Sequence, residues 1–212
     1  MQTSFYRRVL GTLLLTALAS CSGKSDNPYA AIKDPPIAQA TLHTVTLATD
    51  GPTVAEQLHA KGYVPITFSS NYPVSDSVES SLWSVPEPVA AGAAHFKAPG
   101  TAEPNVRVLR MALAANSRAA DSAVDKAFFS NVLGTGVPRL PAGLERTDKV
   151  RVQVWTYVVP DILAANKRLR EGGIPVVYDP VKITTAYLGD HETMAIRAPD
   201  GTIVELVETA SQ

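Results

Sequence analysis

Glu205 is the residue whose surroundings most favour chemistry. It lies in a β-rich run between Ile203 and Val207, and alternation along a strand would put these three side chains on one face. A carboxylate on a core-facing aliphatic surface is unfavourable unless it is paired with or bound to a cation. The pattern therefore makes Glu205 a candidate ligand for a cation. The alternatives are a partly solvated face and an ion pair with an arginine such as Arg151 or Arg197.

A second group of candidate residues lies on one strand with a polar-aromatic face. Gln153, Trp155 and Tyr157 alternate with aliphatic residues, so strict alternation predicts that all three share a face. An amide oxygen binds a hard or borderline divalent ion, and two aromatic rings beside it suit stacking of a planar or apolar substrate. The alternative for the two aromatic residues is packing in the core. Arg151 and Arg197 are candidates to bind a carboxylate or phosphate of that substrate, or are ordinary surface charges.

The first twenty residues have the pattern of an export signal. Two arginines precede an apolar run at residues 9–19, which is too short for a permanent membrane span. Small residues then precede Cys21, the only cysteine, and this arrangement resembles the lipobox of bacterial lipoproteins. An ordinary secretory signal is the alternative.

The lipobox resemblance implies removal of a signal peptide at residues 1–20 and acylation of Cys21 on its thiol and new amino group. Several acyl chains anchor a protein stably, whereas one chain binds only marginally. The residue after the cysteine is Ser22. An aspartate at this place would resemble a signal for retention in the inner membrane, whereas serine resembles a signal for the outer membrane. We therefore expect a lipid-anchored protein of the bacterial cell envelope, at the periplasmic face of the outer membrane, with the lipid bilayer as a partner.

Composition excludes several classes of function. The hydrophobic content is 45% and the net charge is −1, which is typical of a soluble globule with no general attraction to polyanions. Basic runs interleaved with aromatic residues do not occur, so nucleic-acid binding is not expected. Since Cys21 would carry the lipid, stability must come from the core and not from a disulfide.

The elements that must position the candidate residues follow from periodicity and turn signals. Residues 21–40 are polar and rich in proline, and they predict a flexible tether behind the lipidated cysteine. Residues 116–149 predict a helix at 121–133 and a Pro/Gly connector. Alternation predicts strands at residues 41–50, 63–69, 81–85, 93–97, 106–114, 150–158, 175–177, 183–187, 193–198 and 202–207, and further helices at 51–62 and 160–171.

Residues 150–208 resemble one module of the vicinal-oxygen-chelate superfamily, which includes glyoxalase I, extradiol dioxygenases and the bleomycin- and fosfomycin-resistance proteins. The features are the strand ending Val158-Val159-Pro160-Asp161, the helix ending Leu169-Arg170-Glu171-Gly172-Gly173, and the segment Pro199-Asp200-Gly201-Thr202-Ile203-Val204-Glu205-Leu206. The resemblance implies an α+β fold in which paired βαβββ modules form a curved mixed sheet around a cleft. Residues 150–212 would be the second module.

The first module, at residues 41–115, allows two registers. In the first, residues 41–69 supply its opening strand, helix and second strand, and residues 106–114 are its last strand. In the second, residues 106–114 and the helix after them open the module, and residues 41–69 are an added element. We adopt the first register. Family modules pair within a chain or between chains, so the resemblance leaves a homodimer open.

The resemblance implies a divalent metal in the cleft, with Zn, Ni, Mn or Fe as candidates. It places ligands at Glu205 in the closing strand, at Gln153 in the first strand of the second module, and at His43 if the first register holds. Glu205 would also be the catalytic residue. Residues 106–114 contain no acidic side chain, so a four-ligand glyoxalase set is incomplete. A three-ligand set remains open.

Three functions follow from these expectations. The first is a membrane-anchored, glyoxalase-like protein with a small-molecule cleft, in which a metal acts as Lewis acid for lyase or dioxygenase chemistry. The second is a metal-free ligand-binding protein that keeps the cleft. The third is a structural outer-membrane lipoprotein without catalysis. Fold alone does not choose among them, and neither the substrate nor enzymatic activity follows from the sequence.

Overall fold

The computed structural model describes residues 27–37, 39–68, 80, 85–86, 89, 92–100, 103–113, 122–147 and 149–209. The signal peptide, Cys21 and most of the predicted strand at residues 81–85 lie outside this part of the chain. Among the described residues, no helix has the length and apolar character needed to cross a bilayer.

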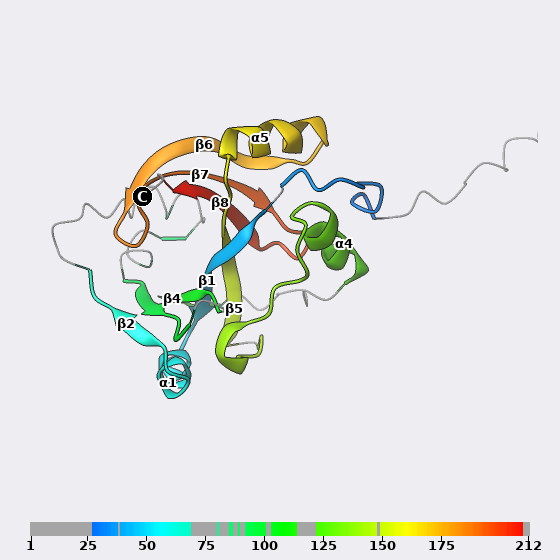
Figure 1. The fold of residues 1–212 in the computed structure, drawn as a ribbon. Coiled ribbons are helices and arrows are strands. Elements are labelled where there is room, and N and C mark those ends of the chain that lie inside the picture. The colour runs from blue at the N-terminus through cyan, green and yellow to red at the C-terminus, as the bar shows by residue number, and fades with distance from the viewer. Residues whose placement is uncertain are drawn as a thin grey trace, which may run out of the picture.

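The described strands form one sheet in the order β2-β3-β4-β1-β5-β8-β7-β6 (Figure 1). They are β1 (Thr41–Thr49), β2 (Val64–Ile66), β3 (Ala94–Lys97), β4 (Asn105–Arg110), β5 (Val150–Val158), β6 (Val176–Thr185), β7 (Gly189–Arg197) and β8 (Ile203–Thr209). The helices are α1 (Thr53–Ala60), α4 (Ala123–Asn131) and α5 (Ile162–Glu171), with a 3-10 turn at Pro141–Gly143.

The sheet consists of two βαβββ halves joined at its centre. In the first half β1 pairs in parallel with β4, and in the second half β5 pairs in parallel with β8. The two opening strands, β1 and β5, pair antiparallel and link the halves. The strand at residues 41–49 therefore opens the first half and β4 closes it, as in the first register. This mixed sheet with helices confirms the predicted α+β class.

The helices cover one face of the sheet, called here the outer face (Figure 1). Side chains from α1, α4 and α5 form a common core with alternate residues of the central strands, including Leu58, Phe128, Leu169, Val45, Leu47, Val106, Val108, Trp155, Tyr157, Val204 and Leu206. Because neighbours on a strand point to opposite sides, Thr46, Arg107, Thr156 and Glu205 belong to the opposite, inner face.

Strand β6 is longer than its sequence predicts. Residues 175–177 and 183–187 read as two strands because Asp179-Pro180 separates them, but the structure has one strand, Val176–Thr185. The pairing with β7 shifts on both sides of Tyr178. β6 is the last strand of the sheet, and an edge strand tolerates proline because one side of its backbone needs no partner.

The predicted tether at residues 21–40 is wrong for the part that the structure describes. Ile37 is buried, its backbone N–H donates to the carbonyl of Val132, and the Nε atom of Arg168 in α5 donates to the carbonyl of Pro36 at 2.7 Å. Tyr29 packs edge-on against Phe128 of α4. These contacts hold residues 27–37 on the helices, so only the chain before Asn27 remains as an expected tether.

Candidate functional site

Glu205 is fully buried on the inner face of β8. Its Oε2 accepts a hydrogen bond from Thr156 Oγ1 at 2.8 Å, and its Oε1 accepts one from Thr193 Oγ1 at 3.2 Å. Thr156 and Thr193 come from the strands on either side, β5 and β7. Hydrogen bonding of both carboxylate oxygens offsets part of the cost of burying the group. Neither Arg151 nor Arg197 forms a recorded ion pair with it among the described residues.

Arg107 occupies the place in the first half that Glu205 occupies in the second. Val45 of β1 faces Trp155 of β5, and the next residues along these strands are Thr46 and Thr156. Thr46 pairs with Arg107 on β4, while Thr156 pairs with Glu205 on β8. The halves are thus related by a pseudo-twofold axis at the centre of the sheet, and the two related inner positions carry opposite charges. Arg107 is also fully buried.

The sequence reasoning noted that residues 106–114 lack an acid but missed Arg107. The available signal was the alternation Val106-Arg107-Val108. An arginine between two core-facing valines of an interior strand must lie on the sheet's other covered face, where burial requires a reason.

His43 and Gln153 occupy the other pair of pseudo-symmetric positions. His43 lies two residues before Val45, and Gln153 lies two residues before Trp155. The pairing of β1 with β5 shifts by one residue at each of these positions, so each is an additional residue between two paired residues of its own strand. Such a β-bulge re-aims side chains. The Nδ1 atom of His43 lies 2.7 Å from Thr44 Oγ1, which places His43 on the inner face with Thr44. Gln153 is half-buried at the equivalent position.

The bulge at Gln153 corrects the predicted face of Trp155 and Tyr157. Strict alternation would keep both aromatic residues beside Gln153, but the additional residue returns them to the outer face with Val152. Trp155 is 0% exposed and Tyr157 is 1% exposed, and burial raises the pKa of Tyr157 to about 12. Both pack in the core beneath the helices, as the packing alternative requires, and neither lines the inner face as a substrate-binding residue.

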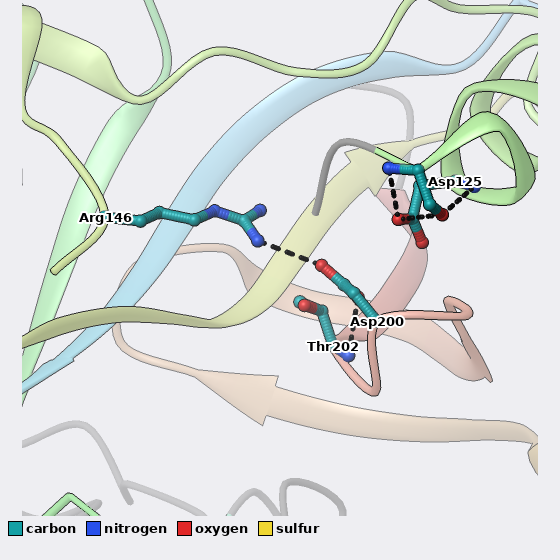
Figure 2. A network of polar contacts seen from close by, with 5 residues as sticks. Asp125, Arg146, Asp200 and Thr202 are labelled. Carbon is teal, nitrogen blue, oxygen red and sulfur yellow. Dashed lines mark hydrogen bonds and ion pairs between the residues drawn. The ribbon is translucent and has the colours of Figure 1, made fainter. Parts of the chain in front are cut away.

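The predicted substrate-binding residue Arg197 and the Pro-Asp-Gly turn have structural contacts. Arg197 is exposed and donates to the carbonyl of Gly201 at 2.8 Å. Asp200 Oδ2 accepts from Arg146 Nη1 at 3.0 Å, and its Oδ1 accepts from the backbone N–H of Thr202 at 2.9 Å (Figure 2). The Asp200 side chain is only 1% exposed. These contacts hold the turn that leads into β8 and so fix the direction of Glu205. Arg151 is partly buried, and its backbone lies opposite Ala48 of β1 in the sheet.

A cavity of about 700 Å³ opens beside His43. Its walls include Thr41, His43, Tyr187, Leu188, Glu208 and Thr209. Burial, and secondarily the positive charge of Arg107, lower the pKa of His43 below its ordinary value, so its imidazole is neutral at pH 7. This cavity is where a small molecule would reach the ring of His43.

Tyr187, in the turn between β6 and β7, lines that cavity and also contacts Arg107. The Arg107 guanidinium carbon lies 4.0 Å from the centre of the Tyr187 ring. His95 of β3 lies on the same side, with ring centres 5.4 Å apart and a tilt of 37°. Burial, with a smaller contribution from the charge of Arg107, lowers the pKa of His95 to about 3. Two of the rings beside Arg107 are thus the phenol of Tyr187 and the imidazole of His95, which is neutral at pH 7.

Apolar side chains close another part of the inner face. Val154, Ile203, Leu109 and Ala195 form a second, smaller core with Val85 from the connection between β2 and β3. Among the described residues, the polar part of this face lies around His43, Arg107 and Tyr187.

The residues present do not fit the divalent metal that the fold resemblance implies. Within the described part of the chain, no three His, Cys, Asp or Glu side chains gather as a metal site. Arg107 stands at the position related to Glu205, and an arginine is protonated at all relevant pH values and has no lone pair to donate. Both oxygens of Glu205 already accept hydrogen bonds. The ligand set of His43, Gln153 and Glu205 stays a prediction.

No family model and no curated protein matches this chain. Among solved structures, methylmalonyl-CoA epimerase from Mycobacterium tuberculosis is similar, with 18% identity and a TM-score of 0.45, over 86% of this chain and 95% of that one. A Mn(II)-bound glyoxalase from Novosphingobium aromaticivorans has 15% identity and a TM-score of 0.42, over 79% of this chain and 38% of that one.

A glyoxalase/bleomycin resistance protein/dioxygenase superfamily member from Vibrio splendidus has 11% identity and a TM-score of 0.39, over 80% of this chain and 98% of that one. At these values no activity transfers to this chain. The fold rests on the strand order itself. Two βαβββ halves joined through β1 and β5 make the vicinal-oxygen-chelate fold that the sequence resemblance implied.

Proposed function

We propose that this protein is a metal-free small-molecule-binding protein with the vicinal-oxygen-chelate fold, held at the bacterial envelope by a lipid on Cys21. The observation that carries the proposal is the buried Arg107 at the position related by pseudo-symmetry to Glu205. A guanidinium is a permanent positive charge. An acidic side chain at this position would attract a metal ion, whereas Arg107 repels one.

The same charge indicates the chemical class of the ligand. Guanidinium groups bind carboxylates and phosphates through charge-assisted hydrogen bonds. His43 on the cavity wall is neutral, so it offers one donor and one acceptor without adding charge. We therefore infer that the ligand is a small anion, and that the cavity beside His43 is its entrance.

Binding is favoured over catalysis because Glu205, the predicted catalytic residue, is not exposed to this cavity. It is fully buried, and two threonine hydroxyls occupy its oxygens. A general base must lie within hydrogen-bond reach of the proton that it removes. The lyase or dioxygenase alternative would require His43, Gln153 and Glu205 to bind a metal together.

Metal titration of the full chain, purified in detergent, tests the proposal. We expect no stoichiometric binding of Zn²⁺, Ni²⁺, Mn²⁺ or Fe²⁺ to the wild-type protein, measured by calorimetry and by elemental analysis after dialysis. Arg107→Glu would restore an acid at the fourth position. We expect this variant to gain binding of a divalent ion and to show a metal-dependent rise in its unfolding temperature, because metal binding stabilises the folded state.

The matched control is Arg107→Glu combined with Glu205→Gln, which should lose the gained metal binding. Stoichiometric metal in the wild-type protein that disappears in Glu205→Gln would overturn the metal-free proposal and support the metal-dependent alternative. An Arg107→Glu variant that folds and binds no metal would show that the pseudo-symmetric position does not govern metal binding.

A further inference from the structure

Tyr187 connects the second half of the protein to the charged position of the first. It belongs to the three-residue turn between β6 and β7, yet its ring contacts Arg107 of β4 and His95 of β3. Phe68 packs edge-on against His95, and their ring centres are 4.8 Å apart. Arg107 and His95 are paired on neighbouring strands, and one planar ring contacts both the guanidinium and the imidazole.

The same ring is a wall of the cavity beside His43. Tyr187 is only partly buried, whereas Arg107 behind it is fully buried. A molecule in the cavity would therefore meet the Tyr187 ring, whose other contact is the buried guanidinium of Arg107.

The turn that carries Tyr187 joins β6, the edge strand of the sheet, to β7. It is supported by a 3.3 Å hydrogen bond from the backbone N–H of Leu188 to Thr185 Oγ1, and Gly189 follows with φ of 68°. Glycine adopts this left-handed conformation without a steric penalty. A hairpin turn moves more readily than the strands that it connects.

We propose that Tyr187 is a displaceable plug and that the site takes a planar aromatic anion, an arylcarboxylate or arylsulfonate. The ligand's ring would replace the Tyr187 ring next to His95, and its acid group would pair with Arg107. This inference rests on the proposed metal-free function and gives it a ligand class. Planarity follows from the ring that now occupies the space, and negative charge follows from the guanidinium.

The competition between the plug and the ligand can be measured with 2-naphthoate as probe. Calorimetric titration of the full chain in detergent should show at least tenfold tighter binding to Tyr187→Ala than to wild type, because the ligand no longer has to displace the tyrosine. Leu188→Ala is the matched control, since it removes the neighbouring side chain of the same turn and the same cavity wall. Its affinity should stay within about threefold of wild type, the ordinary scatter of such contacts.

Two further measurements test the role of charge. The neutral amide 2-naphthamide has the same ring system and should bind Tyr187→Ala at least tenfold more weakly than 2-naphthoate. Arg107→Met in the Tyr187→Ala background should lose naphthoate binding while near-ultraviolet circular dichroism shows intact packing. Tyr187→Leu, which keeps bulk and loses the aromatic ring, replaces Tyr187→Ala if that variant does not fold.

Equal effects of Tyr187→Ala and Leu188→Ala on naphthoate affinity would overturn the plug. Equal binding of naphthoate and naphthamide, or no binding of either to Tyr187→Ala, would overturn the ligand class. These failures leave the metal-free function standing. Stoichiometric metal in the wild-type protein, by contrast, would remove that function whatever the naphthoate result.

Discussion

At the residue scale, the distinguishing feature is that two pseudo-symmetric positions carry side chains of opposite type, a basic one and an acidic one. Thr46–Arg107 and Thr156–Glu205 are equivalent pairs of the two halves, but one carries a guanidinium and the other a carboxylate. Both charged groups are fully buried. Buried charges persist only where neighbouring groups stabilise them. Here threonine hydroxyls stabilise Glu205, and the Tyr187 ring lies against Arg107.

The half-buried histidine next to Arg107 makes stability depend on pH. His95 has a folded-state pKa of about 3, below the ordinary value near 6.5 of an unfolded chain. Between these values the unfolded chain binds a proton at this site and the folded protein does not. Stability is therefore lost as pH falls through this window, by up to about 1.4 kcal/mol per pH unit from this group.

His95→Gln should remove this contribution. We expect the difference in unfolding free energy between wild type and variant to shrink steadily from pH 6.5 to pH 4, measured by urea denaturation at each pH. The difference isolates the histidine, because the other titrating groups are common to both proteins. Parallel stability curves over this range would contradict the assigned pKa.

At the element scale, two β-bulges and one edge strand decide how the sheet presents its side chains. The bulges at His43 and Gln153 shift β1 and β5 by one residue each, and a one-residue shift moves every later side chain to the other face. Trp155 and Tyr157 reach the core for this reason. Pro180 remains in β6 because that strand has a free edge. Neither effect is visible in a pattern of alternating residues.

The docking of residues 27–37 is also a property of elements. Ile37 is 1% exposed and lies against the helices of the outer face. We expect Ile37→Ala to destabilise the protein by about 2–4 kcal/mol, as do other truncations of large aliphatic side chains in a core. Denaturant unfolding would measure it.

The control for this substitution is Leu163→Ala in α5, because Leu163 is 62% exposed. It should change stability by less than about 0.5 kcal/mol. If Ile37→Ala were as mild as Leu163→Ala, residues 27–37 would be a tether after all.

At the scale of the whole molecule, the two halves share one sheet and one core. β1 and β5 pair over the full length of both strands, and the outer core contains side chains from both halves and from α1, α4 and α5. A lone βαβββ unit would leave a sheet face uncovered, so the halves depend on each other. The site is accordingly a property of the complete domain, since Tyr187 and Arg107 come from different halves.

Membrane attachment also belongs to this scale. If Cys21 carries the lipid, the mature protein should begin at residue 21, carry several acyl chains by intact-mass analysis, and partition into the detergent phase. Cys21→Ser should lose the acyl mass and should retain the signal peptide, because the cysteine is the processed residue. A mature wild-type chain with a free Cys21, or with another first residue, would contradict the anchor.

Sequence alone was sufficient for the order of elements in the second half, although it divided β6 into two strands, and it placed His43, Gln153 and Glu205 on strands. Periodicity and turn residues are local properties of the sequence. Glu205 can be identified as a candidate because it is a carboxylate among aliphatic neighbours. The class of the fold followed because a βαβββ unit needs a partner. Local patterns favoured the first register of the first half but did not exclude the second, since two segments could open the module.

Only the tertiary structure decided which strands meet and what lies opposite Glu205. Pairing of β1 with β5 is a long-range contact, and it selects the register, creates the bulges and buries Trp155. Arg107 is related to Glu205 only through the pairing of strands that are far apart in the chain. Tyr187 contacts Arg107 only because the turn between β6 and β7 reaches the other half. Spacing along a sequence carries no record of such contacts, because they depend on how the two halves pack together.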